Sequence, residues 1–194
     1  MVFTTEANQN YYSLKALSDE EIMLKVSNGN LDMLTTLFDR YHIRIFNFLY
    51  KMTRDKMVSE DLTQDVFAKV IRYRSSYNSG NFASWIYTIA RNIFSSYYQK
   101  QKKERSYMIY DDSLDSGEVL ITDSNREELD HLQKALAQLK PSDRELIVMH
   151  RMQEIKYAQI AEIIDSTETA VKVRVHRAVK KLKEVYFQTA TNEM

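Results

Sequence analysis

Apolar residues recur every three or four positions through most of residues 18–105, which is the period of amphipathic helices. Ser18 and Glu21 have the spacing of a capping box and predict a short helix that ends near Asn28. Three longer helices are expected after it, the second beginning at Ser59 or a neighbour and the third following a polar break at 77–81. The residues expected to face inward are Leu31, Leu34, Leu37, Phe38, Tyr41, Ile45, Phe48, Leu49, Met52, Leu62, Val66, Phe67, Val70, Ile71, Phe82, Trp85, Ile86, Ile89, Ala90, Ile93, Phe94 and Tyr97.

A second helical pattern begins near Glu128. The inward-facing residues of its first helix are Leu129, Leu132, Leu136 and Leu139. Pro141 and Ser142 are expected to end this helix, and Ser142 and Glu145 have the spacing of another capping box. The helix after them carries the apolar residues Leu146, Ile147, Met149 and Met152.

Residues 157–182 predict a short helix, a tight break and a longer helix, which is the layout of a helix-turn-helix. The apolar stripe of the longer helix is Val171, Val175, Ala178, Val179 and Leu182. Asp165, Ser166 and Thr167 interrupt the pattern, and a hydroxyl there can cap the next helix. Asp also tolerates the left-handed geometry that such a turn needs.

The composition supports an all-α fold, because 194 residues contain only three Gly and one Pro. Residues 106–128 lack helical periodicity, and from 106 to 130 eight acids stand against one Arg. We therefore expect two small helical domains joined by an acidic flexible linker, the C-terminal one a helix-turn-helix. The expected boundaries are a lead-in at 1–17, domains at 18–105 and 129–187, the linker at 106–128 and a tail at 188–194.

Charge is informative in its distribution, because the net charge of the chain is zero. From residue 170 to 183 there are six Lys or Arg, one His and no Asp or Glu, which favours DNA binding over a merely solvated face. The chain has no Cys, and neither a secretion signal nor a membrane-spanning run is visible, so we expect a cytoplasmic protein without membrane insertion.

The sequence offers no support for catalysis. It has no Walker loop, no dinucleotide fingerprint and no His-Glu-x-x-His motif. Its four His residues have no ligand spacing, and no nucleophile constellation is recognisable. We therefore expect no enzyme activity, no cofactor and no metal site.

Five segments together resemble a known family. They are SEDLTQDVFAKV at 59–70, NFASWIYTIARN at 81–92, LKPSDRELIVMHRM at 139–152, YAQIAEII at 157–164 and VKVRVHRAVKKL at 171–182. In this order and spacing they are similar to the sigma-70 factors of the extracytoplasmic-function (ECF) class, which have only regions 2 and 4. The resemblance covers roughly residues 18–185 and implies a factor that binds core RNA polymerase, selects promoters and helps to open the duplex.

The resemblance implies contacts with the largest-subunit clamp and the flap of core RNA polymerase. The residues it assigns to core binding are Glu60, Asp61, Gln64 and Asp65, on the polar face of one helix. Carboxylates there can form charge-assisted bonds with a basic partner. Without the resemblance, a plain solvated face is the simpler interpretation.

The resemblance also implies two DNA contacts. The residues assigned to the minus-ten element are Tyr77, Asn78, Ser79, Asn81, Phe82, Arg91, Asn92 and Lys100, combining stacking, base-edge and phosphate contacts. Those assigned to the minus-thirty-five element are Thr169, Ala170, Lys172, Val173, Arg174, Arg177, Lys180 and Lys181. Val173 lies opposite the buried stripe, so we expect Val173 and Ala170 to pack on thymine methyl groups.

Two alternatives stay open at this stage. The acidic linker is either a solvated spacer or a polyanion that follows the basic RNA-exit channel of polymerase. The chain as a whole is either a sigma factor, restrained by an anti-sigma factor if it has one, or a stand-alone helix-turn-helix transcriptional regulator. The second hypothesis leaves the aromatic residues near 77–85 and the acidic helix without a role.

Overall fold

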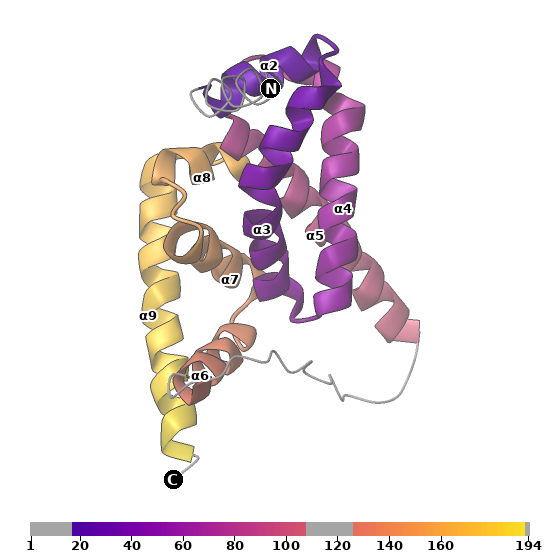
Figure 1. Cartoon of the computed structure of the whole chain (residues 1–194). Helices are drawn as coiled ribbons and strands as arrows, with labels where there is room; N and C mark the ends of the chain where they lie inside the picture. The colour runs from indigo at the N-terminus through magenta and orange to yellow at the C-terminus, as the bar shows by residue number, and fades with distance from the viewer. Residues whose placement is uncertain (1–16, 108–125, 193–194) are drawn as a thin grey trace, which may run out of the picture.

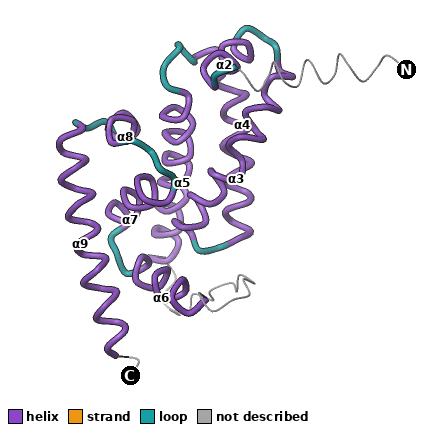
Figure 2. Tube along the Cα trace, turned by 60° about the vertical axis from the view of Figure 1, so that its left-hand side comes forward, coloured by secondary structure: helices purple, strands orange, loops and turns teal. Residues whose placement is uncertain are grey.

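The computed structural model of the protein describes residues 17–107 and 126–192, and the regular elements among them are all helical (Figures 1 and 2). The predicted all-α class is confirmed. Most of the expected linker, at 108–125, lies outside the described residues, as do residues 1–16 of the lead-in and 193–194 of the tail.

The helices of the N-terminal half pack as a bundle in which α3, α4 and α5 run side by side and α2 crosses one end (Figure 1). In chain order the elements are α2 (Asp19–Ser27), η1 (Leu31–Met33), α3 (Leu34–Thr53), α4 (Lys56–Tyr73), η2 (Arg74–Ser76) and α5 (Phe82–Tyr107). The capping box is confirmed: the Glu21 amide donates to Ser18 Oγ at 3.1 Å, and the Ser18 amide donates to Glu21 Oε2 at 2.8 Å.

The turn between α3 and α4 makes the helix expected to begin at Ser59 start earlier. Arg54 has left-handed geometry with a φ of 62°, and the Asp55 carboxylate accepts a hydrogen bond from the Val58 amide at 3.0 Å. This cap starts α4 at Lys56, before Ser59. Ser59 is instead a fully buried residue inside the helix.

Three residues expected to face inward are exposed: Leu31 by 46%, Phe38 by 43% and Ile71 by 40%. Leu31 belongs to η1 and precedes the helix whose apolar seam it was expected to join. Phe38 lies at the edge of that seam, where its ring stacks on His42 at a centroid distance of 4.7 Å. Ile71 directly follows the fully buried Val70, and one helical step turns its side chain away from the core.

The C-terminal half contains the expected helix-turn-helix. Its elements are α6 (Arg126–Ala137), α7 (Pro141–Ile147), the π-helical turn η3 (Val148–Met152), α8 (Tyr157–Ile163) and α9 (Glu168–Asn192). At the turn, Asp165 has a φ of 51°, and Thr167 Oγ1 accepts a hydrogen bond from the Ala170 amide at 3.2 Å. Both the left-handed turn and the hydroxyl cap are thereby confirmed.

The capping box expected at Ser142 and Glu145 is wrong. Helix α7 begins at Pro141, after Lys140, and has no side-chain cap. Proline suits the first helical position because its missing amide N–H would have no partner there. The Glu145 side chain is therefore free to point elsewhere, and it reaches into the contact between the two halves.

The two halves share one apolar core, which the sequence did not predict. Helices α7 and α8 lie between α9 and the helices of the N-terminal half, with α9 at one edge of the molecule and α4 at the other (Figures 1 and 2). The C-terminal residues that join the N-terminal core are Leu146, Val148, Met149, Ile155, Ile160, Ala161, Ile163, Val171 and Val175. A smaller cluster, formed by Leu136, Leu139, Ile147 and Ala178, fixes α6 and α7 to α9.

Candidate nucleic-acid interface

The outer face of α9 is cationic and exposed. Val171, Val175 and Ala178 are buried against α6, α7 and α8, so the opposite side of the helix faces solvent. Its exposed residues include Thr169, Lys172, Val173, Arg174, Arg177 and Lys180, while Ala170 and Lys181 are half-buried. Val173 is 45% exposed, which confirms that it is not a core residue.

Two of the cations on this face are held by acids of the chain. Lys172 Nζ lies 3.2 Å from Glu168 Oε1, one helical turn away, and 5.8 Å from the centre of the Tyr157 ring. Lys181 Nζ lies 3.9 Å from Asp143 Oδ2 of α7. Both pairs are accessible to solvent, and such pairs contribute little to stability, so both cations can exchange their partners for phosphates at low cost.

The segment between η2 and α5, residues 77–81, forms a second polar surface. We call it the 77–81 loop. The Tyr77 ring is buried edge-on against Phe82 and Trp85, and its hydroxyl donates to the Gly80 carbonyl. Between these anchors Asn78, Ser79 and Gly80 are exposed, and Ser79 has a φ of 66°. The loop therefore presents its tip to solvent on a fixed aromatic base.

The residues predicted for the minus-ten contact differ in their accessibility. Asn78, Ser79, Asn92 and Lys100 are exposed, and Asn81 and Arg91 are half-buried. Tyr77 is only 6% exposed and Phe82 is fully buried. In this conformation Tyr77 and Phe82 support the loop from the core side, and neither ring has a face open to solvent.

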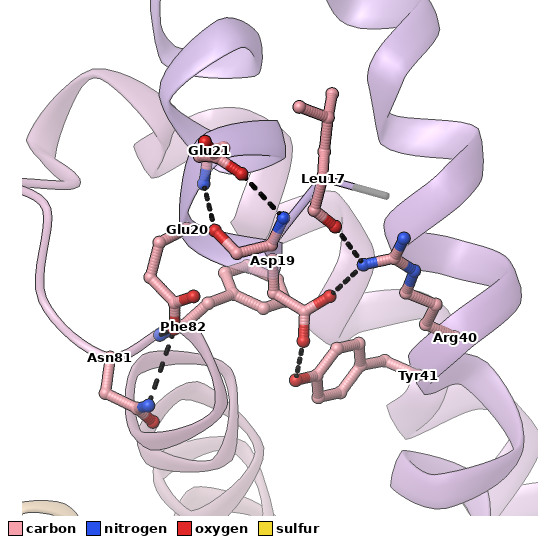
Figure 3. Close-up of polar contacts among 9 residues, drawn as sticks. Leu17, Asp19, Glu20, Glu21, Arg40, Tyr41, Asn81 and Phe82 are labelled. Atoms are coloured by element: carbon pink, nitrogen blue, oxygen red, sulfur yellow. Dashed lines mark hydrogen bonds and ion pairs between the residues drawn. The ribbon is translucent and has the colours of Figure 1, made fainter. Parts of the chain in front are cut away.

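Asn81 is the N-terminal cap of α5 and is fixed on several sides. Its Oδ1 accepts hydrogen bonds from the amide and hydroxyl of Ser84, at 2.8 and 3.1 Å. The carboxylate of Glu20, on α2, accepts from the Phe82 amide at 3.1 Å and from Asn81 Nδ2 at 3.4 Å (Figure 3). The end of the loop is therefore held by a helix that lies about sixty residues earlier in the chain.

Polar contacts bridge the two halves at Asn81 and again more than two turns further along α5, at Arg91. Gln159 of α8 donates to Asn81 Oδ1 at 3.0 Å, and Arg91 Nε lies 3.0 Å from Glu145 Oε1. The Arg91 contact is an ion pair and not an aligned hydrogen bond. Burial raises the pKa of Glu145, whereas the nearby Arg91 and Arg174 act in the opposite direction. Two residues predicted to touch DNA are thus engaged by the C-terminal half.

A further bridge centres on Gln153, which is buried. Its carbonyl accepts a hydrogen bond from Arg44 at 2.8 Å, and its side-chain oxygen accepts one from the Tyr87 hydroxyl at 3.0 Å. Sequence patterns gave no sign of Glu20, Gln153 or Gln159, because each acts on a residue more than sixty positions away.

Helix α4, which carries the predicted core-binding residues, lies on the opposite edge of the molecule from α9 (Figure 1). Glu60, Asp61, Gln64 and Asp65 are all exposed. Glu60 makes a loose ion pair with Lys56 at 3.9 Å. The structure therefore brings the four residues of the predicted core-binding set onto one accessible surface.

Within the described residues, no helix is long and apolar enough to span a membrane. In the same part of the chain, no three His, Asp or Glu side chains are grouped so that they could hold a metal ion.

Comparison with known proteins gives two matching families along the chain. Residues 37–104 match Sigma-70 region 2, and residues 129–182 match Sigma-70, region 4. The RNA polymerase sigma factor CarQ of Myxococcus xanthus is 31% identical over 164 residues, covering 84% of this chain and 94% of CarQ. The ECF RNA polymerase sigma factor SigM of Bacillus subtilis is 29% identical over 160 residues, covering 81% of this chain and 97% of SigM.

Solved structures agree in fold. CnrH, in complex with the cytosolic domain of CnrY, matches with a TM-score of 0.68 at 18% identity, over 86% of this chain and 96% of CnrH. The sigma factor RpoE of Bartonella quintana, in complex with the anti-sigma factor NepR, matches with a TM-score of 0.68 at 24% identity, over 78% of this chain and 95% of RpoE.

Proposed function

The chain belongs to the sigma-70 family as an ECF RNA polymerase sigma factor with regions 2 and 4, and from this premise we propose which of its surfaces bind promoter DNA and which bind polymerase. It directs RNA polymerase to promoters, and its family is non-catalytic, so nucleotidyl transfer belongs to the polymerase. In our proposal region 2 spans residues 18–105 and region 4 spans residues 129–187. Because transcription takes place on chromosomal DNA, we place the chain in the cytoplasm.

Region 4 contacts the minus-thirty-five element through α9. The observation that carries this assignment is the exposed cationic face opposite the buried residues Val171, Val175 and Ala178. Arg174, Arg177 and Lys180 contact phosphates, which position the helix without reading sequence. Thr169, Ala170 and Val173, near the start of the helix, reach base edges in the major groove.

Region 2 contacts the minus-ten element through the 77–81 loop. Its exposed Asn78 and Ser79 are the residues available to the edge of an unstacked base. Asn92 and Lys100 lie further along α5 and can meet phosphates. Promoter melting is assisted when the loop holds a base that has left the duplex.

The same surfaces indicate which proteins the chain binds. The acidic face of α4 binds the clamp of core RNA polymerase, and region 4 meets the flap. Because RpoE of Bartonella quintana was solved with the anti-sigma factor NepR, we propose that an anti-sigma factor can also restrain this chain.

Start-site mapping tests the whole proposal. The purified chain and bacterial core RNA polymerase are incubated with genomic DNA, and the 5′ ends of the transcripts are sequenced. We expect new start sites, not selected by core enzyme alone, that share one sequence block near minus thirty-five and another near minus ten. Unchanged start sites, together with DNA binding by the free chain, would instead support the stand-alone regulator.

Val173 gives a sharper test of region 4. We expect Val173→Ser to reduce the preference for thymine over uracil in the minus-thirty-five element by about fourfold, since burial of one methyl contributes about 0.8 kcal/mol. Holoenzyme binding to matched thymine and uracil duplexes measures the ratio. Lys180→Ala is the control, because loss of a phosphate contact weakens both duplexes equally. An unchanged ratio in Val173→Ser would show that this side chain does not touch a thymine methyl.

A further inference from the structure

The first turn of α2 carries three consecutive acids, Asp19, Glu20 and Glu21, and each has a different partner (Figure 3). Glu21 closes the capping box of its own helix by accepting from the Ser18 amide. Asp19 Oδ1 lies 2.6 Å from Arg40 Nη1, and its Oδ2 accepts from the Tyr41 hydroxyl at 2.6 Å. Asp19 therefore fastens α2 to α3, and Glu21 holds the end of α2 in shape.

Glu20 points the other way, toward the start of α5 (Figure 3). One oxygen, Oε1, accepts from the Phe82 amide at 3.1 Å and from Asn81 Nδ2 at 3.4 Å. The Phe82 amide is one of the first amides of α5, which have no partner within the helix. A carboxylate placed there also interacts favourably with the positive end of the helix dipole.

Asn81 is thereby fixed at both ends of its amide group. Its oxygen accepts from Ser84, and its nitrogen donates to Glu20. This arrangement sets the direction in which the chain enters α5 and hence the position of the exposed loop tip. Glu20 also lies near the other anchor of the loop: burial, followed by the charges of Glu20 and Asp19, raises the pKa of Tyr77 to about 12.

We infer that Glu20 is a positioning residue for promoter recognition, which holds the 77–81 loop in the geometry that engages the minus-ten element. This inference rests on the proposed function of the loop. Glu20 itself does not contact DNA; it acts through Asn81 and the Phe82 amide. Its charge is useful because a hydrogen bond to a carboxylate is stronger than one to a neutral acceptor.

The test compares holoenzymes binding a labelled single-stranded DNA that carries the minus-ten sequence from the start sites mapped with the wild-type chain. We expect Glu20→Ala to weaken this binding about tenfold, the effect of losing a hydrogen bond to a charged group. Glu20→Gln keeps an acceptor oxygen and should restore affinity to within about threefold of wild type. Core binding should stay unchanged in both variants.

Glu21→Ala is the matched control, because it removes the neighbouring acid and the capping box of α2 without touching the loop. It should bind the minus-ten strand like wild type. The single Trp of the chain, Trp85, packs on Tyr77 at a centroid distance of 5.4 Å and reports on the loop. We expect its emission to shift in Glu20→Ala and to stay unchanged in Glu21→Ala.

A variant of the loop tip separates failure of this inference from failure of the proposed function. If Asn78→Ala weakens strand binding and Glu20→Ala does not, the loop contacts DNA and the role of Glu20 is wrong. If neither variant weakens it, the loop itself does not contact the minus-ten element and both ideas fail. Should Glu20→Ala not fold, Glu20→Asp must show the loss, because the shorter carboxylate is withdrawn from α5; wild-type affinity there overturns the inference.

Discussion

Tethering region 4 to region 2 is expected to abolish promoter-directed transcription. The chain has no Cys, so Arg44→Cys and Glu154→Cys would introduce the only two thiols. These positions lie on the two sides of the contact, because Arg44 donates to the carbonyl of Gln153, the residue before Glu154. A short bis-maleimide that joins them should hold the two halves in the arrangement described above.

The expected loss follows from the length of DNA between the two promoter elements. About 25 bp separates them, which corresponds to ~85 Å of B-DNA. In the structure, α8 and α5 are in direct contact, and Gln159 bonds to Asn81, so one closed chain cannot lie on both elements. Losing one of two linked contacts removes an affinity gain of about 10²–10⁴. We therefore expect promoter-specific transcripts to fall about a hundredfold or more in a run-off assay.

The length of the cross-linking reagent provides the decisive control. The same double variant joined by a long polyethylene glycol bis-maleimide, whose reach exceeds the separation of the two elements, should regain transcription. Each single-Cys variant treated with the short reagent should remain active, since neither residue belongs to the proposed DNA or polymerase surfaces. Full activity of the short-tethered chain would show that the closed arrangement is compatible with initiation.

The structure explains why some features could be predicted from the sequence. The buried stripe of α9 and the exposure of Val173 follow from the helical repeat within a few turns, and the Ser18 capping box depends on residues three positions apart. The turn at Asp165 is equally local. For such features both partners of each interaction lie within a few residues of each other in the sequence.

Other features depend on contacts that no local pattern contains. Glu145 has the spacing of a capping residue, yet the preference of Pro141 for the first helical position shifts the helix and lets Glu145 meet Arg91 of α5. Phe82 has the aromatic character expected of a base-stacking residue, but it also fits the apolar seam of α5, and burial of its ring decides its place. When the local sequence allows a residue two roles equally, its contacts with residues far away in the chain decide which role it takes.

The packing of the two halves against each other is the largest difference from the sequence-based expectation. An amphipathic pattern predicts that a residue such as Ile160 is buried but not which helix covers it. Ile160 could equally belong to a core confined to the helix-turn-helix, whereas its cluster is continuous with that of the N-terminal half. The same apolar stripe is consistent with a separate domain and with a shared core, so only the three-dimensional arrangement distinguishes them.

Reversing the charge of the acidic face on α4 is expected to disrupt binding to core RNA polymerase. In Asp61→Lys with Asp65→Lys, like charges would meet across the proposed interface with the clamp, which costs several kcal/mol and lowers affinity about a hundredfold or more. Both side chains are exposed, so the free energy of unfolding should change by only about 0.5 kcal/mol for each. Titration of labelled chain with core enzyme measures the affinity, and urea unfolding measures the stability.

The matched control is Asp32→Lys with Asp39→Lys, which makes the same change in net charge at two exposed positions outside the α4 face. If binding depended only on the overall charge of the chain, both double variants would weaken it equally, because long-range attraction depends on total charge. A selective loss in the α4 variant, which diminishes as salt screens the interaction, identifies a specific contact surface. Equal binding by both variants and wild type would remove α4 from the polymerase interface, and the acidic face would then be a solvated helix surface.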